Sequence, residues 1–161
     1  MVNSDRRELI DVLHRRLVPA VEQLGFVAVA PDAREKNTEA GAAFPFGRLR
    51  RRTADGFDLI EIQFEKDGSA AFRLNVGQVP SVGIEHAVGH VAAEDVWVHY
   101  LEHFCTLYSS RYFRRWFRFE ASDAAANRER LKALADAVIR LLPEVDDFLK
   151  SGKCCRNLRC V

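Results

Sequence analysis

The sequence predicts a single α+β domain in which a largely antiparallel sheet of about five strands carries helices packed on one face. Apolar residues recur at helical spacing near both ends of the chain, and strand-like runs divided by Asp-Gly pairs lie between them. A chain of 161 residues, 48% hydrophobic and 29% charged, can bury a core without disulfides or metals. We therefore expect one domain over residues 1–150.

The N-terminal third should form a helix, a short strand and a loop. Apolar residues at steps of three and four predict an amphipathic helix over residues 5–24. Pro19 lies inside this pattern and is expected to kink or split the helix. Residues 25–30, "GFVAVA", are typical of a short strand, and the polar, aperiodic stretch 31–43 indicates a loop.

Three strand-like runs between residues 44 and 77 should form two hairpins. In the middle run, Ile60, Ile62 and Phe64 alternate with polar residues, so one face of the sheet points to the core. A three-residue loop at Asp67–Ser69 is predicted, because it pairs Ile62 with Leu74 and keeps both strands in phase.

The first hairpin is predicted to turn at Asp55-Gly56. A two-residue turn there sets Leu49 opposite Ile62 and Arg50 opposite Glu61. Both turns are thus selected by the requirement that the apolar face stays on one side of the sheet.

The second half of the chain should contain two helical regions and one strand. The spacing of Trp97, Leu101, Phe104 and Tyr108 predicts a helix over residues 94–108. The aromatic-rich run "RYFRRWFRF", residues 111–119, is interpreted as a further strand. A final helix should be capped by Ser122 or Asp123, and Pro143 should bend it or begin a new one.

The predicted register places a polar set of side chains on the outward face of the sheet. This set is the candidate binding site: Arg48, Arg50, Glu61, Gln63, Arg73 and Asn75. A basic and aromatic sheet face resembles surfaces that bind RNA. A solvated face in which Arg50 pairs with Glu61 is the favoured interpretation, because the interspersed carboxylates weaken a field that would attract phosphate.

Two histidine pairs raise the question of a metal centre. "HYLEH", His99 to His103, matches the H-x-x-E-H pattern, and "HAVGH", His86 to His90, has the same spacing without the internal Glu. On the predicted helix, His99 and His103 point away from the apolar stripe, and the sequence offers no evident third ligand. We therefore expect no metal and no cofactor.

The remaining features concern cysteines and charge. "KCCRNLRCV" crowds three of the four cysteines near the C-terminus after Ser151-Gly152, with a spacing that matches no usual zinc pattern, and residues 151–161 are expected to form a mobile tail. The net charge is +1, with no apolar run long enough for a membrane span. The expected location is cytoplasmic, without membrane association.

The chain also resembles a bacterial family of domains of unknown function. The resemblance rests on an opening helix that ends in "LGF", the strand "LIEIQF" with Gln63, and the strand "FRLNVG" with Asn75 and Gly77. It covers roughly residues 5–149. The family brings no established activity, so the resemblance implies only that Gln63 and Asn75 belong to a shared polar site.

Taken without a structure, these patterns favour a non-catalytic binding or protein-interaction domain that uses an open polar sheet face, because arginine and aromatic residues are enriched at interfaces. Two alternatives stay open. One is a metal-dependent enzyme that uses His99 and His103. The other is a nucleic-acid-binding module, which the near-zero net charge argues against.

Overall fold

The computed structural model describes residues 4–110 and 112–160, and it confirms the α+β class. Its elements in chain order are α1 (Ser4–Gln23), β1 (Val27–Val29), the 3₁₀ turn η1 (Glu35–Asn37), α2 (Glu39–Ala43), β2 (Arg48–Arg52), β3 (Gly56–Phe64), β4 (Ala71–Pro80), β5 (Ile84–His86), β6 (Gly89–Val91), η2 (Ala93–Asp95), η3 (Val98–Tyr100), β7 (Cys105–Leu107), β8 (Phe117–Arg118), α3 (Ala124–Ile139), α4 (Leu142–Ser151) and β9 (Leu158–Cys160).

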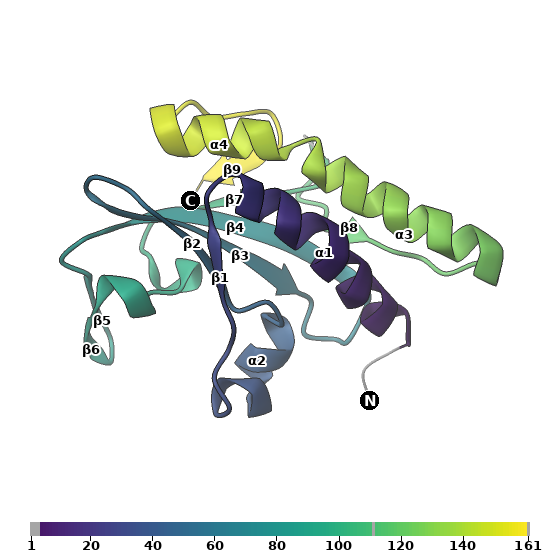
Figure 1. The fold of residues 1–161 in the computed structure, drawn as a ribbon, viewed down its shortest axis with the longest axis horizontal. Helices are drawn as coiled ribbons and strands as arrows, with labels where there is room; N and C mark the ends of the chain where they lie inside the picture. Colours follow the sequence, from purple (N-terminus) through teal and green to yellow (C-terminus); the bar gives the residue numbers. More distant parts are fainter. Residues whose placement is uncertain (1–3, 111, 161) are drawn as a thin grey trace.

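The described strands form one seven-stranded sheet and a small separate hairpin. The order in the large sheet is β1-β2-β3-β4-β7-β9, with β8 pairing a further stretch of β4, and every pairing among the described residues is antiparallel. Strands β5 and β6 form the hairpin by themselves. Figure 1 shows α1, α3 and α4 on one side of the sheet, with α2 and the β5–β6 hairpin on the other.

The main core lies between the sheet and helices α1, α3 and α4. Leu9, Leu13 and Leu17 of α1 are fully buried against the apolar face, as their helical spacing predicts. The Asp123 side chain caps α3 by accepting a hydrogen bond from the Ala126 N–H at 2.9 Å. Pro143 begins a new helix, as predicted, because it lies in the first turn of α4.

Helix α1 passes through Pro19 without ending there. Of the two expected effects of Pro19, a kink or a split, the split is therefore wrong. Proline removes one backbone donor, but burial of Leu17, Val18 and Val21 on both sides of Pro19 stabilises the helix across it.

The register of the two hairpins was predicted correctly in one case and wrongly in the other. Phe64 pairs with Phe72 and Ile62 with Leu74, as the core alternation requires. In the first hairpin Leu49 pairs with Ile60, not Ile62, and the connection spans Thr53–Gly56. A shift of two residues leaves the same side chains on the core face, so alternation cannot exclude it.

The helix expected over residues 94–108 is absent. This stretch forms η2, η3 and strand β7, and residues 93–104 lie over the second face of the sheet; we call them the covering segment. Its buried Val96, Trp97 and Val98 are consecutive in sequence, so they do not share one helical face. The spacing that resembles a helical stripe comes from an irregular segment that packs its apolar side chains on the sheet.

The C-terminal stretch belongs to the domain. Strand β9 pairs with β7, and Cys105 forms a disulfide with Cys160 across the two strands. The expectation that residues 151–161 form a tail outside the fold is therefore wrong for this strand. Leu158 is 3% exposed and joins the main core, which explains why the strand docks. Of the strand expected over residues 111–119, residue 111 lies outside the described residues, and within residues 112–119 the strand is limited to β8.

Candidate functional site

The second face of the sheet carries an apolar half that requires a cover. Phe57 and Leu59 of β3 and Val79 of β4 point to this face and pack against Val96 and Val98 of the covering segment. These side chains form a second core on the opposite side of the sheet from the helices. The face that the sequence predicts to be open is closed at this end.

Arg48 and Arg50 help to attach the covering segment. Arg48 donates from Nη1 to the carbonyl of Asp95 at 3.2 Å, and Arg50 donates from Nη1 to the carbonyl of Glu94 at 2.7 Å. The Arg48 guanidinium also lies 5.2 Å from the centre of the Trp97 ring. Both arginines are half-buried, and their guanidinium groups already bond to the covering segment.

Glu61, on the second face of the sheet, holds the covering segment through hydrogen bonds. Its side chain is 1% exposed, and its two oxygens accept three hydrogen bonds. Asn75 Nδ2 donates to Oε1 at 2.8 Å, while the Val98 N–H and His99 Nδ1 reach Oε2 at 3.1 and 3.0 Å. These bonds compensate for burying the carboxylate. Glu61 is therefore part of the interior.

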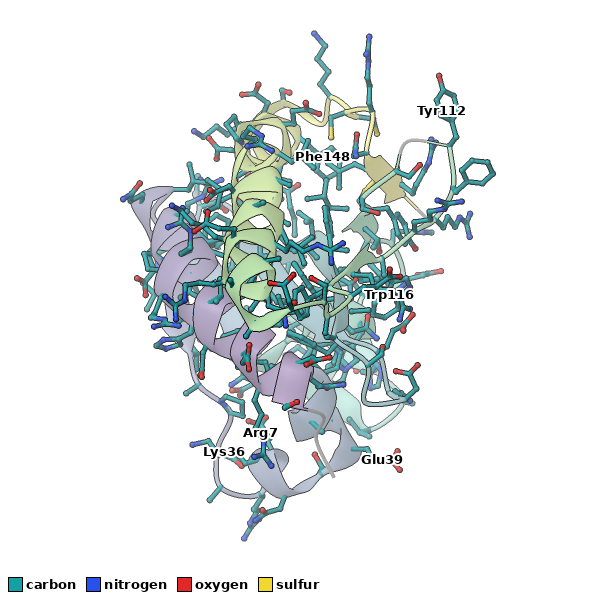
Figure 2. The ribbon with its side chains drawn as sticks, turned by 90° about the vertical axis from the view of Figure 1, so that its right-hand side faces the viewer. Arg7, Lys36, Glu39, Tyr112, Trp116 and Phe148 are labelled. Atoms are coloured by element: carbon teal, nitrogen blue, oxygen red, sulfur yellow. A yellow bond between two sulfur atoms is a disulfide. The ribbon has the colours of Figure 1, made fainter. Side chains whose placement is uncertain are left out.

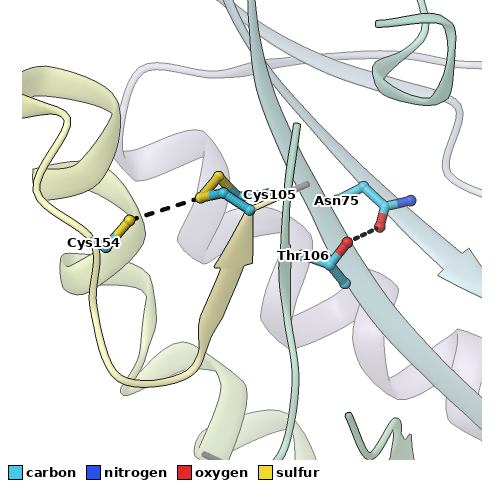
Figure 3. The surroundings of a disulfide bond; sticks show 5 residues. Asn75, Cys105, Thr106 and Cys154 are labelled. Atoms are coloured by element: carbon cyan, nitrogen blue, oxygen red, sulfur yellow. Dashed lines mark hydrogen bonds between the residues drawn. A yellow bond between two sulfur atoms is a disulfide. The ribbon is translucent and has the colours of Figure 1, made fainter. Parts of the chain in front are cut away.

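Asn75 is the centre of a polar network beneath the cover. It is fully buried; besides Glu61 it donates to Gln63 Oε1 at 2.9 Å, and its Oδ1 accepts from Thr106 Oγ1 at 2.9 Å (Figure 3). Arg73 Nε also donates to Gln63 Oε1, at 3.0 Å. The structure thus brings Glu61, Gln63, Arg73 and Asn75 together in one hydrogen-bonded network, in which Glu61 and Asn75 are buried and Gln63 and Arg73 are half-buried.

The histidine motif is divided between two roles. The His99 ring stacks on Phe44 with 4.7 Å between ring centres and donates to Glu61, whereas His103 is exposed. Within residues 4–110 and 112–160 no cluster of three His, Cys, Asp or Glu side chains is arranged to hold a metal ion. His99 therefore contributes to closing the second face.

A second buried polar cluster joins the sheet to α4. Arg51 contacts Asp58 at 2.7 Å and Asp146 at 2.6 Å, and it also donates to the Leu24 carbonyl at 2.9 Å. Burial by itself raises the pKa of Asp146, but hydrogen bonds from Lys150 and Arg51 outweigh burial and hold that pKa below its ordinary value. The cluster has a structural role between β2, β3 and α4.

The most exposed aromatic side chains lie in the loop between β7 and β8. Tyr112 is 76% exposed and Phe113 is 62% exposed, and Figure 2 shows Tyr112 pointing into solvent, away from the labelled Trp116. The loop is closed at its base, where the Ser109 N–H donates to the Arg115 carbonyl at 2.8 Å. A defined loop therefore carries both aromatic rings outward.

Arginines lie against two aromatic rings of this region. The Arg115 guanidinium lies 5.0 Å from the Phe113 ring centre, and Arg73 lies 4.6 Å from that of Trp116. The C-terminal stretch is attached directly beside the loop, because Tyr108 and Asn157 exchange two hydrogen bonds of 3.1 and 3.0 Å. That stretch adds further exposed cations: Lys153, Arg156 and Arg159.

We call residues 108–110, 112–116 and 153–160 the basic aromatic surface. Together these described residues contain five Lys or Arg residues and no Asp or Glu. The sequence analysis missed this surface because it assigned the first segment to a strand and the second to a mobile tail. The signal was present in "RYFRRWF" and "KCCRNLR", two carboxylate-free basic runs, but their proximity depends on β9 pairing with β7.

Fold and site together define a class: an α+β domain with both faces of its antiparallel sheet covered and a basic aromatic surface at one edge. No protein-family model, curated protein or solved structure matches the chain. Among the described residues, no helix is both long enough and apolar enough to span a membrane.

Proposed function

We propose that this protein is a non-catalytic binding domain and that its ligand is single-stranded nucleic acid, held on the basic aromatic surface. One observation carries the proposal. Two segments that are distant in sequence supply five described cations without a carboxylate, next to the exposed rings of Tyr112 and Phe113. Proteins that bind single strands combine a positive surface for the phosphates with aromatic rings on which bases stack.

The distribution of charge supports an anionic ligand at this edge. The whole chain has a net charge of +1 and the basic aromatic surface carries +5, so the rest of the chain carries −4. A near-neutral net charge therefore coexists with a local excess of cations at this edge. The carboxylates that weaken a phosphate-attracting field on the sheet face do not belong to the basic aromatic surface. They are Glu61, which is buried, and Glu65, which pairs with Arg118.

The small apolar area favours a nucleic acid over a protein partner. A stable protein interface buries about 800 Å² on each side around a well-packed apolar centre. The exposed aromatic area here comes from two adjacent side chains surrounded by arginines. Such a surface is better suited to stacking one or two bases and pairing with their phosphates. The sheet face expected to receive a protein partner is covered at one end by the covering segment.

The non-catalytic part of the proposal rests on the roles that the reactive groups already have. Glu61 and His99 bond to each other and hold the covering segment, and Asn75 completes the carboxylate's hydrogen bonds. A cytoplasmic location and membership of the bacterial family of uncharacterised domains are further parts of this proposal. Both agree with a small nucleic-acid-binding domain.

Fluorescence anisotropy with a labelled 12-nucleotide single strand, as RNA and as DNA, tests the proposal. Replacing both Tyr112 and Phe113 with alanine should weaken binding about tenfold or more, because each stacked base contributes about 1–3 kcal/mol. Replacing Arg114 and Arg115 with alanine should reduce the slope of log K against log salt by about 1.4, since each phosphate contact contributes about 0.7 for single strands.

The matched controls are Arg7→Ala and Arg128→Ala, which remove exposed arginines from α1 and α3. Figure 2 shows Arg7 and Tyr112 at opposite ends of the molecule. These controls should bind like the unmodified protein. Absence of binding at low salt would contradict the proposal, as would equal losses in the controls. Tighter binding to a poly-glutamate peptide than to the oligonucleotide would assign the surface to an acidic protein instead.

A further inference from the structure

Three of the four cysteines meet at the edge of the sheet. Cys105 of β7 and Cys160 of β9 form the disulfide, and the Sγ atom of Cys154 lies 3.7 Å from the Sγ atom of Cys160 (Figure 3). Cys154 is exposed and remains a free thiol. A thiol in contact with one sulfur of a disulfide is positioned for thiol–disulfide exchange, which proceeds by attack of a thiolate on a disulfide sulfur.

We propose that the Cys105–Cys160 bond is exchangeable and that Cys154 is its internal exchange partner. The Cys154 thiolate attacks Sγ of Cys160, and a new Cys154–Cys160 bond forms. The bond between Cys160 and Cys105 breaks, and its electron pair leaves with Sγ of Cys105. Cys105 then takes up the proton that Cys154 lost. One disulfide and two thiols exist before and after the step, so it needs no external oxidant.

The two free cysteines differ in their fitness for this reaction. Cys154 is exposed, whereas Cys155 is half-buried. Burial raises the pKa of the Cys155 thiol, and its hydrogen bond with Glu144 raises that pKa further, so less of it is in the reactive thiolate form. Cys155 therefore serves as the matched control for its neighbour.

Burial of Cys105 sets the direction of the equilibrium. Cys105 is 5% exposed and belongs to the main core, where its thiolate is a poorly stabilised leaving group. The Cys105–Cys160 bond is thus the resting form, and the exchanged form is a minority. Exchange removes the covalent tie between β7 and β9, which then depends on three residue pairs and the buried Leu158.

Peptide mapping of the full-length, disulfide-containing protein tests this proposal. The protein is incubated at pH 8 without added thiol, quenched with acid at intervals, alkylated and digested with trypsin. Trypsin cleaves after Lys153, Arg156 and Arg159, so the exchanged bond appears as a peptide of residues 154–156 linked to the peptide that begins at Cys160. We expect this pair, with alkylated Cys105, in the unmodified protein and in Cys155→Ser.

The Cys154→Ser variant should not form the exchanged pair, although it should keep the Cys105–Cys160 bond and the far-ultraviolet spectrum of the unmodified protein. A second variant, Cys105→Ser, removes the competing bond and should form Cys154–Cys160 when treated with oxidised glutathione. The proposal is overturned if Cys155→Ser shows no exchanged pair, or if Cys105→Ser leaves both thiols free. Stoichiometric zinc on the reduced chain in native mass spectrometry would also overturn it, because the cysteines would then be metal ligands.

Discussion

Replacing Asn75 with alanine measures whether the second face of the sheet is interior. Asn75 is fully buried and makes three side-chain hydrogen bonds of 2.8 to 2.9 Å, to Glu61, Gln63 and Thr106. A hydrogen bond to a charged group contributes about 1.5–3 kcal/mol, and a neutral one about 0.5–1.5 kcal/mol. Because the three bonds share one side chain and are not additive, we expect a loss of about 2–4 kcal/mol in unfolding free energy.

Urea unfolding followed by circular dichroism is the appropriate assay, since a lower midpoint with an unchanged slope reports stability alone. Thr106→Val provides a partner for a double-mutant cycle with Asn75→Ala, because it removes one of the three bonds. We expect the double variant to lose at least about 0.5 kcal/mol less than the sum of the single losses. A loss below about 0.5 kcal/mol in Asn75→Ala would refute this account, because that is the effect of a solvated surface residue.

Three further changes test the packing and the charges. Ile62→Ala should cost about 2–5 kcal/mol in unfolding free energy, because Ile62 is fully buried in the main core; a calorimetric loss under about 1 kcal/mol would contradict this. Gly77→Val should destabilise the fold by about 1–3 kcal/mol, since a Cβ atom at Gly77 would overlap Leu101 of the covering segment; an unchanged melting temperature would show that the cover yields freely. Asp146→Asn should cost about 1–2 kcal/mol at pH 7. The lowered folded-state pKa of Asp146 means that its ionic stabilisation is present above the unfolded pKa and lost as pH falls through the folded pKa. The unfolding free energies of the variant and the parent should therefore converge as the pH is lowered; an equal difference at pH 7 and in acid, measured by urea titration, would contradict the assignment.

The sequence predicted those elements whose hydrophobic pattern is compatible with only one arrangement of the chain. Helical spacing located α1 and α3, and alternation in β3 and β4 determined their register, because a shift by one residue would have moved Ile62 and Leu74 to the wrong face. The turn at Asp55-Gly56 was wrong because a shift by two residues satisfies the same alternation.

The covering segment was missed because one signal was not used. Phe57, Leu59 and Val79 make half of the second face apolar, and such a face must be buried. The neighbouring polar residues of this face were predicted to be exposed to solvent, but Glu61 and Asn75 are buried beneath the covering segment. Which segment supplies the cover depends on contacts between distant residues, and no local pattern encodes them.

The basic aromatic surface and the disulfide depend on the same missing information. Cysteine spacing alone does not determine which thiols pair, so the bond between Cys105 and Cys160 could not be predicted. The docking of β9 on β7 brings the C-terminal cations beside the loop that carries Tyr112 and Phe113. Each run was visible in the sequence, but their combination into one surface was not.

The central claim is that this surface, and not the polar residues of the sheet, binds the ligand. A titration of ¹⁵N-labelled protein with an unlabelled 12-nucleotide single strand, followed by backbone amide chemical shifts, tests it residue by residue. We predict that the largest shifts fall within residues 108–110, 112–116 and 153–160, while the amides of Glu61 and Asn75 change little because the cover separates them from solvent. Shifts concentrated at Glu61, Asn75 and the covering segment, or no shifts at low salt, would contradict the account.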